Sequence, residues 1–371
     1  MSNPIRVTFC GGGSGGHLTP AIAIADALRS INPDVRLSFL TSSREIDRSI
    51  IDDWKVDKKE IQFEQLPLAT SRHRIVFGLK LIFATIRCIR LMRSRRPSVV
   101  LGLGGFASVP GVIAARILRI PVALLETNCV PGRANRFLSR WARITFTGWK
   151  LIDSARTSWK SHVLSTGVPI RQQVTDCGTK QPAAHKTLLV LGGSQGASSL
   201  NDLVIRSVLD SSCLPENWRV VHQTGPNEFE VVAERYSATN AGHEVCAFVR
   251  DVPTALRSSS ILITRAGAVT LAEAAACSCA SIIIPMMRAA DGHQMQNAKH
   301  LADYNAAIVI DESDPDAATI LTDAIKQLVS SENDRKKLSN GIAKLSPTDA
   351  AECVAQQLIQ IANGRTESAA T

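Results

Sequence analysis

Two glycine-rich turns, each placed between an apolar run and a helical pattern, constrain the fold more than any other feature. The first turn, Gly11 to Gly16, follows an apolar run at 5–10, and the second begins at Gly192 after a run at 187–191. A β-rich run that ends at glycine and continues as a helix is typical of parallel α/β units. The two turns begin 181 residues apart, about half of the 371-residue chain. The sequence therefore predicts two Rossmann-like domains, one after the other.

Apolar runs at 35–40, 99–103 and 122–125 alternate with helical patterns. This alternation predicts parallel sheets covered by helices on both faces. The turn-rich residues 166–169 are the expected linker. Because ligands of such sheets bind beyond the carboxyl ends of the strands, we expect the substrate in the cleft between the domains. The 45% hydrophobic composition suffices for two packed cores and excludes a disordered chain.

Charge is divided unevenly between the two halves. Residues 1–170 contain 25 Lys and Arg against 11 Asp and Glu, whereas residues 171–371 contain 17 against 22. Between Glu64 and Glu126 there are ten basic residues and no acidic one. This excess predicts an anionic partner for the first half: nucleic acid, anionic lipid or an anionic substrate. Nucleic acid is not expected, because no recognition motif or aromatic stacking platform accompanies the charge.

The basic stretch at 72–96 also has a helical pattern. Its apolar residues recur at helical spacing with basic residues alongside. The apolar set is Ile75, Leu79, Ile82, Ile86 and Ile89, and the basic set is Lys80, Arg87, Arg90 and Arg93. One interpretation is a helix that faces the core and has a solvated basic face. The other is a segment that docks on an anionic membrane surface.

Cysteine and aspartate spacings give no metal site. Nine cysteines are an odd number and contain no C-x-x-C pair, so we expect reduced thiols and no metal. The D-x-D at Asp314-Pro315-Asp316 follows other polar residues and is interpreted as a turn. The N-terminus lacks the apolar segment of a signal peptide, and no apolar stretch is long enough for a spanning helix. A cytoplasmic protein is the expectation.

The first glycine turn satisfies G-x-G-x-x-G, which by itself supports several functions. Glycine allows close approach of a ligand, and the following helix N-terminus favours a phosphate. A dinucleotide-binding domain would also need an acid near the end of the second strand, where this chain has Arg44, which suits only an NADP phosphate. A purely structural turn is a further interpretation. His17 follows the turn directly, and a neutral imidazole beside a phosphate can serve as a general base.

A second polar cluster lies at 264–298. Residues 264–273 follow an apolar run and open a helix, with the Thr270 hydroxyl and the Glu273 carboxylate near its start. Such a helix start suits the phosphate and ribose of a nucleotide. The alternative is capping and complementation of the helix dipole. A loop at 291–297 is rich in side chains that hydrogen-bond sugar hydroxyls.

Together these motifs resemble the MurG family, the bacterial N-acetylglucosaminyltransferases of peptidoglycan synthesis. Any one motif alone has little specificity, but the ordered set is specific. The resemblance covers the chain from about Ile5 to the last helix. The matching segments are 11–17, 102–111, 125–128, 167–171, 192–197, 265–273 and 291–298.

The resemblance implies a GT-B fold with three parts. Residues 1–166 would form an acceptor-binding, membrane-facing domain, and 167–346 a domain that binds UDP-GlcNAc. Residues 347–371 would contain a last helix, roughly 348–363, that returns to the first domain. The implied reaction is inverting transfer of GlcNAc from UDP-GlcNAc to the 4-hydroxyl of the muramyl unit of lipid I, which forms lipid II without a cofactor. The implied location is the cytoplasmic face of the bacterial plasma membrane, as a peripheral protein.

Three alternatives stay open beside this one. The first is another UDP-sugar enzyme on the same fold, either a UDP-GlcNAc 2-epimerase or a glycosyltransferase of secondary metabolism. The second is an NADP-dependent oxidoreductase. The third is a non-catalytic module that binds nucleotide sugars, in which His17 would be dispensable.

The resemblance also implies roles for single residues. His17 matches the proposed base, and Glu273 matches the residue that binds the ribose. Asn128 and Gln294 match residues that hold hydroxyls of GlcNAc. The other matched positions are Ser14, Gly15 and Gly16 near the donor sugar and phosphates, Arg171 and Ser194 near the diphosphate, Val249 at the uracil, and Ala268, Val269, Thr270, Leu271 and Ala272 at the start of the nucleotide-binding helix.

Two positions depart from the family pattern. Ser14 stands where threonine is usual, and it keeps the hydroxyl. His293 stands where some members have glutamine, so its contact to the sugar is not carried over.

Overall fold

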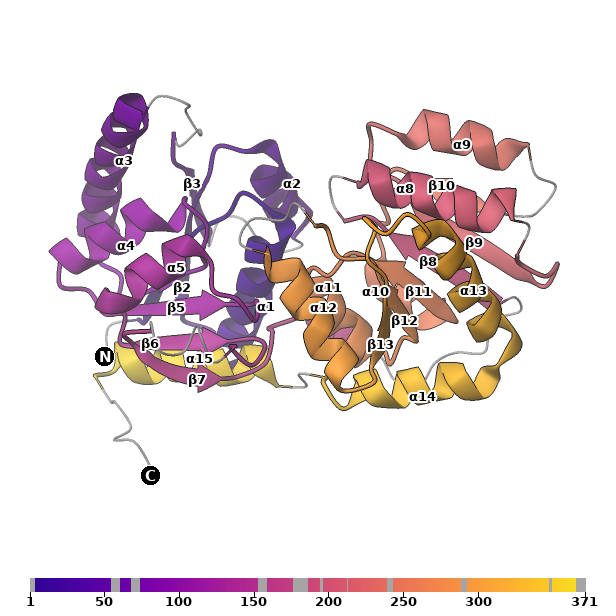
Figure 1. Ribbon diagram of the computed structural model, residues 1–371. Helices are drawn as coiled ribbons and strands as arrows, with labels where there is room; N and C mark the ends of the chain where they lie inside the picture. The colour runs from indigo at the N-terminus through magenta and orange to yellow at the C-terminus, as the bar shows by residue number, and fades with distance from the viewer. Residues whose placement is uncertain are drawn as a thin grey trace. The chain divides into compact units, whose positions relative to one another are not determined.

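The chain folds into two α/β units (Figure 1). The computed structural model describes residues 4–54, 61–67, 74–152, 159–175, 186–193, 196–211, 213–238, 243–287, 292–346 and 349–364. The first unit combines Met1–Arg171 with Asp349–Thr371, and the second is Gln172–Thr348. Each unit is built on a wholly parallel sheet. The predicted α/β class with two Rossmann-like domains is therefore confirmed.

The sheet of the first unit has the strand order β3-β2-β1-β4-β5-β6-β7. Its strands are β1 (Arg6–Cys10), β2 (Arg36–Thr41), β3 (Ile61–Gln65), β4 (Val99–Gly102), β5 (Val122–Glu126), β6 (Ile144–Thr147) and β7 (His162–Ser165). The order reverses between β1 and β4, and ligands of open parallel sheets bind at such a point. The first glycine turn follows β1 there.

Helices cover both faces of this sheet. They are α1 (Gly15–Ile31), α2 (Glu45–Asp53), α3 (Arg74–Arg95), α4 (Ser108–Ile117), α5 (Arg133–Leu138) with the 3₁₀ turn η2 (Ser139–Trp141), and α15 (Ala350–Ala362). In the core, the rings of Phe9 and Phe39 stack with centroids 4.6 Å apart. Val354 and Leu358 of α15 are fully buried in the same core, and α15 lies on α1 (Figure 1). The last helix of the chain is thus part of the first unit.

Helix α3 buries a different face from the one that the Leu79–Ile82–Ile86 stripe suggested. These three side chains are 52%, 57% and 41% exposed. The residues that α3 buries are Ala84, Cys88 and Met92, which join a core with α4. The predicted stripe is therefore exposed at Leu79, Ile82 and Ile86, whereas its last residue, Ile89, is partly buried against the core that α3 shares with α4.

The second unit repeats the plan with the strand order β10-β9-β8-β11-β12-β13. The strands are β8 (Lys186–Leu191), β9 (Trp218–Gln223), β10 (Glu244–Cys246), β11 (Ile261–Thr264), β12 (Ser281–Ile283) and β13 (Ala307–Val309). The helices are α7 (Gln172–Thr175), α8 (Ser198–Val204) with the π-helix η3 (Ile205–Asp210), α9 (Phe229–Ser237), α10 (Val252–Ser258), α11 (Ala268–Ala276), α12 (His293–Asp303), α13 (Ala317–Ser330) and α14 (Glu332–Ala343). Here the order reverses between β8 and β11, which the second glycine turn and α11 follow.

In the part of the chain that the structure describes, no helix combines the length and the apolar character needed to cross a membrane.

Candidate active site

The first glycine turn is held by a buried aspartate, Asp47, from α2. The backbone N–H of Gly13 donates to both carboxylate oxygens of Asp47, at 2.7 and 2.9 Å. Ser42, at the end of β2, donates to the same carboxylate from its backbone and its hydroxyl. Gly12 has a φ of +149°, and a Cβ there would collide with the Asp47 carboxylate. Glycine is therefore required at position 12 by both conformation and space.

Arg44 also belongs to this turn. Its guanidinium donates to the carbonyl oxygen of Gly13 at 2.8 Å. The polar residues after β2 therefore stabilise the glycine turn itself. In a dinucleotide-binding domain the side chain at this place would bind the ribose or its phosphate, whereas here Arg44 contacts the turn.

His17 lies in the first turn of α1 and contacts two parts of the chain. Its Nδ1 is 2.9 Å from the hydroxyl of Ser14, the residue before the helix. Its ring faces the turn after β4, where Gly104 and Gly105 have φ angles of +88° and +67°. A Cβ on Gly104 would lie 3.4 Å from His17 Nε2, and one on Gly105 would lie 3.4 Å from its Cε1. The absence of side chains at Gly104 and Gly105 leaves the space that the imidazole occupies.

Asn128 lies just beyond the end of β5 and is held by Glu126. Both its backbone N–H and its amide Nδ2 donate to Glu126 Oε1, at 3.1 Å each. Sequence reasoning did not single out Glu126, although the quoted 125–128 motif contains it. The acid is only 4% exposed.

The second glycine turn, after β8, is similarly supported by its neighbours. Gly193 and Gly196 have φ angles of +86° and +74°. Gln223 at the end of β9 donates to the carbonyl oxygen of Gly193 at 2.6 Å. A Cβ on Gly196 would collide with the Thr224 carbonyl, so the turn packs directly on the end of β9. Ser194, a predicted site residue, lies outside the described residues.

The predicted nucleotide-binding helix start is the N-terminus of α11. Ala268, Val269, Leu271 and Ala272 are buried, and Thr270 is partly exposed. Glu273 is 3% exposed and lies beyond the first helical turn, which contains no acidic residue. The first turn of α1, with Gly15 and Gly16, lacks one as well. Both helix N-termini therefore keep their positive potential for an anion.

Val249 and Arg171 lie elsewhere along the chain. Val249 is 9% exposed and sits in the segment between β10 and α10. Arg171 is the last residue of the first unit before the chain enters the second, and it is partly exposed.

A buried ion pair joins the strand ends around α11. Arg265 follows β11 and is 2.7 Å from Glu312 Oε2, while its Nη2 donates to Ser199 Oγ at 2.6 Å. Arg265 Nη1 also donates to the carbonyl oxygen of Ile284 at 3.0 Å. These contacts connect α8 with segments that follow β11, β12 and β13. Arg265 lies within the 265–273 motif, whereas no local sequence pattern marks Glu312.

Gln294 and Asn297, in the first turns of α12, attach that helix to two neighbouring loops. Gln294 Oε1 accepts a hydrogen bond from the backbone N–H of Met286 at 2.9 Å. Asn297 donates to the carbonyl oxygen of Ala266 at 3.1 Å. The loop before α11 and the loop after β12 are therefore both fixed to α12. His293, the first residue of this helix, is partly exposed.

Among the described residues there is no cluster of three or more His, Cys, Asp or Glu that could hold a metal ion. The D-x-D segment is a turn before α13, in which Asp314 accepts a hydrogen bond from the Asp316 backbone. The described cysteines are free thiols, and burial raises the pKa of Cys88 to about 12.

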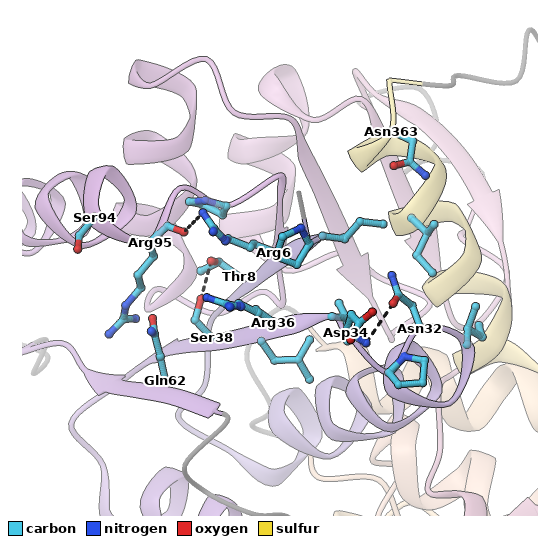
Figure 2. Close-up of a pocket in the computed structure, with 18 residues that line it drawn as sticks. Arg6, Thr8, Asn32, Asp34, Arg36, Ser38, Gln62, Ser94, Arg95 and Asn363 are labelled. Atoms are coloured by element: carbon cyan, nitrogen blue, oxygen red, sulfur yellow. Dashed lines mark hydrogen bonds between the residues drawn. The ribbon is translucent and has the colours of Figure 1, made fainter. Parts of the chain in front are cut away.

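A cavity of about 1330 Å³ opens at the opposite, amino edge of the first sheet (Figure 2). Arg6, Arg36 and Arg95 line it, and Arg6 donates to the carbonyl oxygen of Arg95 at the end of α3. Helices α1, α3 and α15 all end beside it. Arginines complement the negative potential of helix C-termini. None of the predicted site residues that the structure describes lines this cavity. Both glycine turns follow the carboxyl ends of their strands, where the candidate active site is placed.

Comparison with known proteins decides the family. The N-terminal domain of glycosyltransferase family 28 matches residues 7–147, and the C-terminal domain of that family matches residues 187–354. The chain belongs to glycosyltransferase family 28. Both glycine turns and the helix start at α11 lie inside the matched ranges.

Several family 28 relatives carry one name, UDP-N-acetylglucosamine–N-acetylmuramyl-(pentapeptide) pyrophosphoryl-undecaprenol N-acetylglucosamine transferase. The relative from Anaeromyxobacter dehalogenans is 32% identical over 97% of this chain and 94% of its own length. The relative from Syntrophus aciditrophicus is 35% identical over 84% of this chain and 86% of its own length. The relative from Alcanivorax borkumensis is 31% identical over 97% of this chain and 99% of its own length. The resemblance to the MurG family is therefore confirmed.

Solved structures agree with the family 28 fold. The crystal structure of Acinetobacter baumannii MurG is 26% identical, has a TM-score of 0.76, and covers 96% of this chain and 100% of its own. A UDP-N-acetylglucosamine 2-epimerase has a TM-score of 0.69 at 14% identity, and the spinosyn rhamnosyltransferase SpnG 0.65 at 14%. The last two share only the fold. The expected GT-B fold is thus confirmed, and membership of family 28 overturns the oxidoreductase alternative.

Proposed function

We propose that this chain transfers N-acetylglucosamine from UDP-GlcNAc to the 4-hydroxyl of the muramyl unit of lipid I and forms lipid II. The observation that carries the proposal is the identity of 31–35% with relatives named for that reaction, over most of both chains. The His17–Ser14 pair on the first glycine turn supplies the chemistry that such a transfer needs.

His17 is the proposed base. In a single displacement the 4-hydroxyl loses its proton as its oxygen bonds to C1 of GlcNAc, and the bond from C1 to the UDP phosphate breaks with inversion. For His17 Nε2 to take the proton, Nδ1 must carry a hydrogen and donate it to Ser14 Oγ, 2.9 Å away. A hydrogen bond in that direction holds the ring with Nε2 as the basic nitrogen.

The negative charge that develops on the departing UDP also needs stabilisation. The N-terminus of α11, beginning at Ala268, offers backbone N–H groups and no acidic residue in its first turn. The N-terminus of α1, at Gly15, has the same property. We assign the phosphates to such helix ends with Arg171 and Ser194, and the ribose to Glu273. This assignment requires no metal ion and no cofactor.

The sugar and the base of the donor have separate proposed contacts. Asn128 and Gln294 hold hydroxyls of GlcNAc, and the backbone at Val249 binds the uracil. Gln294 Oε1 accepts from the Met286 backbone, which fixes the orientation of its amide. With the oxygen engaged, Gln294 presents its N–H groups as donors to a sugar oxygen.

Five exposed apolar side chains on α3 form a patch that suits a lipid surface. The α3 patch consists of Val76, Leu79, Ile82, Phe83 and Ile86, which are 41–67% exposed. Arg90 and Arg93 continue the exposed face toward the end of the helix. Apolar residues that insert beside cations which attract anionic headgroups are typical of interfacial helices.

From this patch we infer the roles of the parts of the chain. The first unit binds the lipid-linked acceptor and contacts the anionic cytoplasmic face of the bacterial plasma membrane. The second unit makes most of the contacts to UDP-GlcNAc. Nucleic acid is not a proposed partner, because the cations of α3 accompany exposed apolar side chains and not a platform for base stacking.

The decisive experiment measures transfer of labelled GlcNAc from UDP-GlcNAc to a soluble lipid I analogue. Wild-type protein is expected to form the disaccharide, and His17→Ala is expected to bind UDP-GlcNAc without transferring the sugar. A folded wild type that binds UDP-GlcNAc without transfer would overturn the proposal, and conversion of the donor to UDP-N-acetylmannosamine would replace it with 2-epimerisation. A His17→Ala variant that transfers the sugar within tenfold of the wild-type rate would keep the enzyme and remove the base.

A further inference from the structure

Glu126, at the carboxyl end of β5, is the centre of a hydrogen-bond network. Its Oε1 accepts from the backbone N–H and the side-chain Nδ2 of Asn128, at 3.1 Å each. Its Oε2 accepts from the backbone N–H of Gly132 and from Asn135 Nδ2, at 3.0 Å each. One buried carboxylate therefore organises the whole segment from the end of β5 to the first turn of α5.

The chemistry of these contacts restricts what can occupy position 126. All four partners are N–H donors, and two carboxylate oxygens offer about four lone-pair positions. A glutamine would bring an NH₂ group against two of the donors. The same four contacts engage both oxygens of Glu126 within the protein, so its role differs from that of His17.

We propose that Glu126 is a positioning residue for sugar recognition, which it serves by fixing the amide of Asn128. This inference rests on the proposed function, in which Asn128 holds a hydroxyl of GlcNAc. The bond from Asn128 Nδ2 to Glu126 turns the oxygen end of the amide away from the carboxylate. Glu126 thereby sets whether the amide presents an acceptor or a donor to the sugar.

The network also extends to the neighbourhood of His17. Asn135 is 2% exposed, and its Nδ2 donates to the carbonyl oxygen of Leu125 at 2.9 Å as well as to Glu126. A Cβ on Gly104 would lie 3.2 Å from Asn135 Nδ2 and 3.4 Å from His17 Nε2. Asn135 and His17 therefore flank the same glycine. Glu126 therefore orders the proposed sugar contact and also holds Asn135, which lies beside the turn at Gly104.

The test compares the affinities of UDP-GlcNAc and UDP, because their ratio isolates the contribution of the sugar. Glu126→Gln is expected to lower the affinity for UDP-GlcNAc about 10-fold and to leave the affinity for UDP unchanged. Asn128→Ala should do the same. Because Glu126 acts through Asn128, the variant that carries both substitutions should bind UDP-GlcNAc no more than about twofold more weakly than Asn128→Ala alone. Glu352→Gln, on the exposed face of α15, makes the same chemical change in the first unit and serves as the control.

The outcomes separate this inference from the proposed function. Losses that multiply in the double variant, a parallel loss of UDP affinity, or wild-type affinity in Glu126→Gln would overturn it. Transfer to the lipid I analogue is measured in parallel. A wild type without transfer, in which the sugar-dependent coupling persists, would reject the proposed reaction and keep the role of Glu126.

A second variant covers the case in which Glu126→Gln does not fold. Asn128→Asp leaves Glu126 intact and places two carboxylates against each other, and a shared proton restores the lost hydrogen bond. The affinity of Asn128→Asp for UDP-GlcNAc should therefore rise as the pH falls from about 8 to about 6, relative to wild type. An affinity of the variant that follows the wild-type pH dependence would contradict the proposal.

Discussion

The hydroxyl of Ser14 and the Nδ1 of His17 lie 2.9 Å apart across the first turn of α1. Ser14 occupies the position before the helix, where a serine hydroxyl usually caps a backbone N–H. Here the hydroxyl makes no such cap and contacts the imidazole. The helix start thus gives up a stabilising bond and gains a defined orientation of its histidine. A capping residue that serves a neighbouring side chain is a sign of function at this turn.

Replacement of His17 should remove catalysis and spare binding. Loss of a general base typically lowers kcat about 10²- to 10⁴-fold. We expect this loss in His17→Ala, with the Kd of UDP within about twofold of wild type because the nucleotide contacts are made by other residues. Rapid-quench measurement of transfer and calorimetry with UDP check the two parts. A kcat that falls less than tenfold would exclude His17 as the base.

Removal of the Ser14 hydroxyl should lower kcat by a measurable amount, but by less than removal of the His17 imidazole. Ser14→Ala removes the partner of Nδ1, and a lost hydrogen bond of about 1 kcal/mol corresponds to roughly a 5-fold lower kcat. Ser14→Thr keeps the hydroxyl and is expected to lose less than Ser14→Ala. The pH profile of kcat in the two variants is the measurement. Equal losses in both would indicate that the size of residue 14, and not its hydroxyl, is what matters.

Gly104 has a left-handed backbone conformation and also lies against His17. The effect of the first on stability and of the second on the transfer rate can be measured separately. Its φ is +88°, and that of Gly364, after α15, is +74° with nothing within 4 Å of a Cβ. Alanine at either site costs about 1–2 kcal/mol of unfolding free energy from backbone strain. Only Gly104→Ala should also lower the transfer rate. Thermal melts and transfer assays of both variants check this, and equal transfer rates would show that Gly104 serves the turn alone.

Most inner strands were predictable from the sequence because they are buried on both faces, although the inner strands β6 and β9 were not predicted. Continuous apolar runs marked β1, β2, β4, β5, β8 and β11 to within a few residues. The polar edge strand β3, with sequence IQFEQ, has no such run and was missed, as was β10 at the edge of the second sheet. An edge strand is stabilised by pairing on one side, so its sequence has less need of apolar residues.

The candidate site was predictable where glycine or a motif marked it, and unpredictable where long-range hydrogen bonds formed it. Asp47 is 34 residues from Gly13, and Glu312 is 47 residues from Arg265, so no local pattern relates either pair. The face of α3 was also ambiguous, because Ala84, Cys88 and Met92 form a second stripe at helical spacing. Only packing against α4 decides which stripe is buried.

The α3 patch should be needed for binding to anionic vesicles. Phe83 is 67% exposed, as is Val231 on α9 of the second unit. Phe83→Asp should lower co-sedimentation with phosphatidylglycerol vesicles about 10-fold, because it removes an apolar insertion and adds a charge that the surface repels. Val231→Asp makes a matched change at equal exposure and should bind as wild type does. Equal binding by the two variants, or binding insensitive to anionic lipid and salt, would refute the membrane assignment.

The pair Arg265–Glu312 should stabilise the second unit. Removal of one partner of a buried ion pair typically costs about 3–5 kcal/mol, because it leaves the other charge uncompensated. The side chains of Arg265 and Glu312 are 6% and 16% exposed. Glu312→Ala should therefore lower the midpoint temperature of unfolding by several degrees. It should also lower the affinity for UDP-GlcNAc, because Arg265 connects the loops at the proposed donor site. Glu332→Ala removes the partner of exposed Lys336 and should change neither quantity. Similar effects of Glu312→Ala and Glu332→Ala would contradict the prediction that the Arg265–Glu312 pair is the more stabilising of the two.

His222 makes the stability of the second unit depend on pH. Its ring contacts Tyr236 and Asn201, both at 3.1 Å, and burial lowers its pKa from 6.5 to about 4. Below pH 6.5 the unfolded chain binds a proton that the folded chain does not, so this contribution to stability is complete above pH 6.5. It is lost as the pH falls toward 4, at up to about 1.4 kcal/mol per unit.

Chemical denaturation at several pH values between about 8 and 4 measures this dependence. His222→Gln has no titrating ring, so its unfolding free energy should fall less steeply below pH 6.5 than that of wild type, although the variant is less stable at neutral pH. His300→Gln, at a partly exposed position on α12, should keep the wild-type slope. A His222→Gln curve parallel to wild type throughout would mean that other groups cause the acid sensitivity.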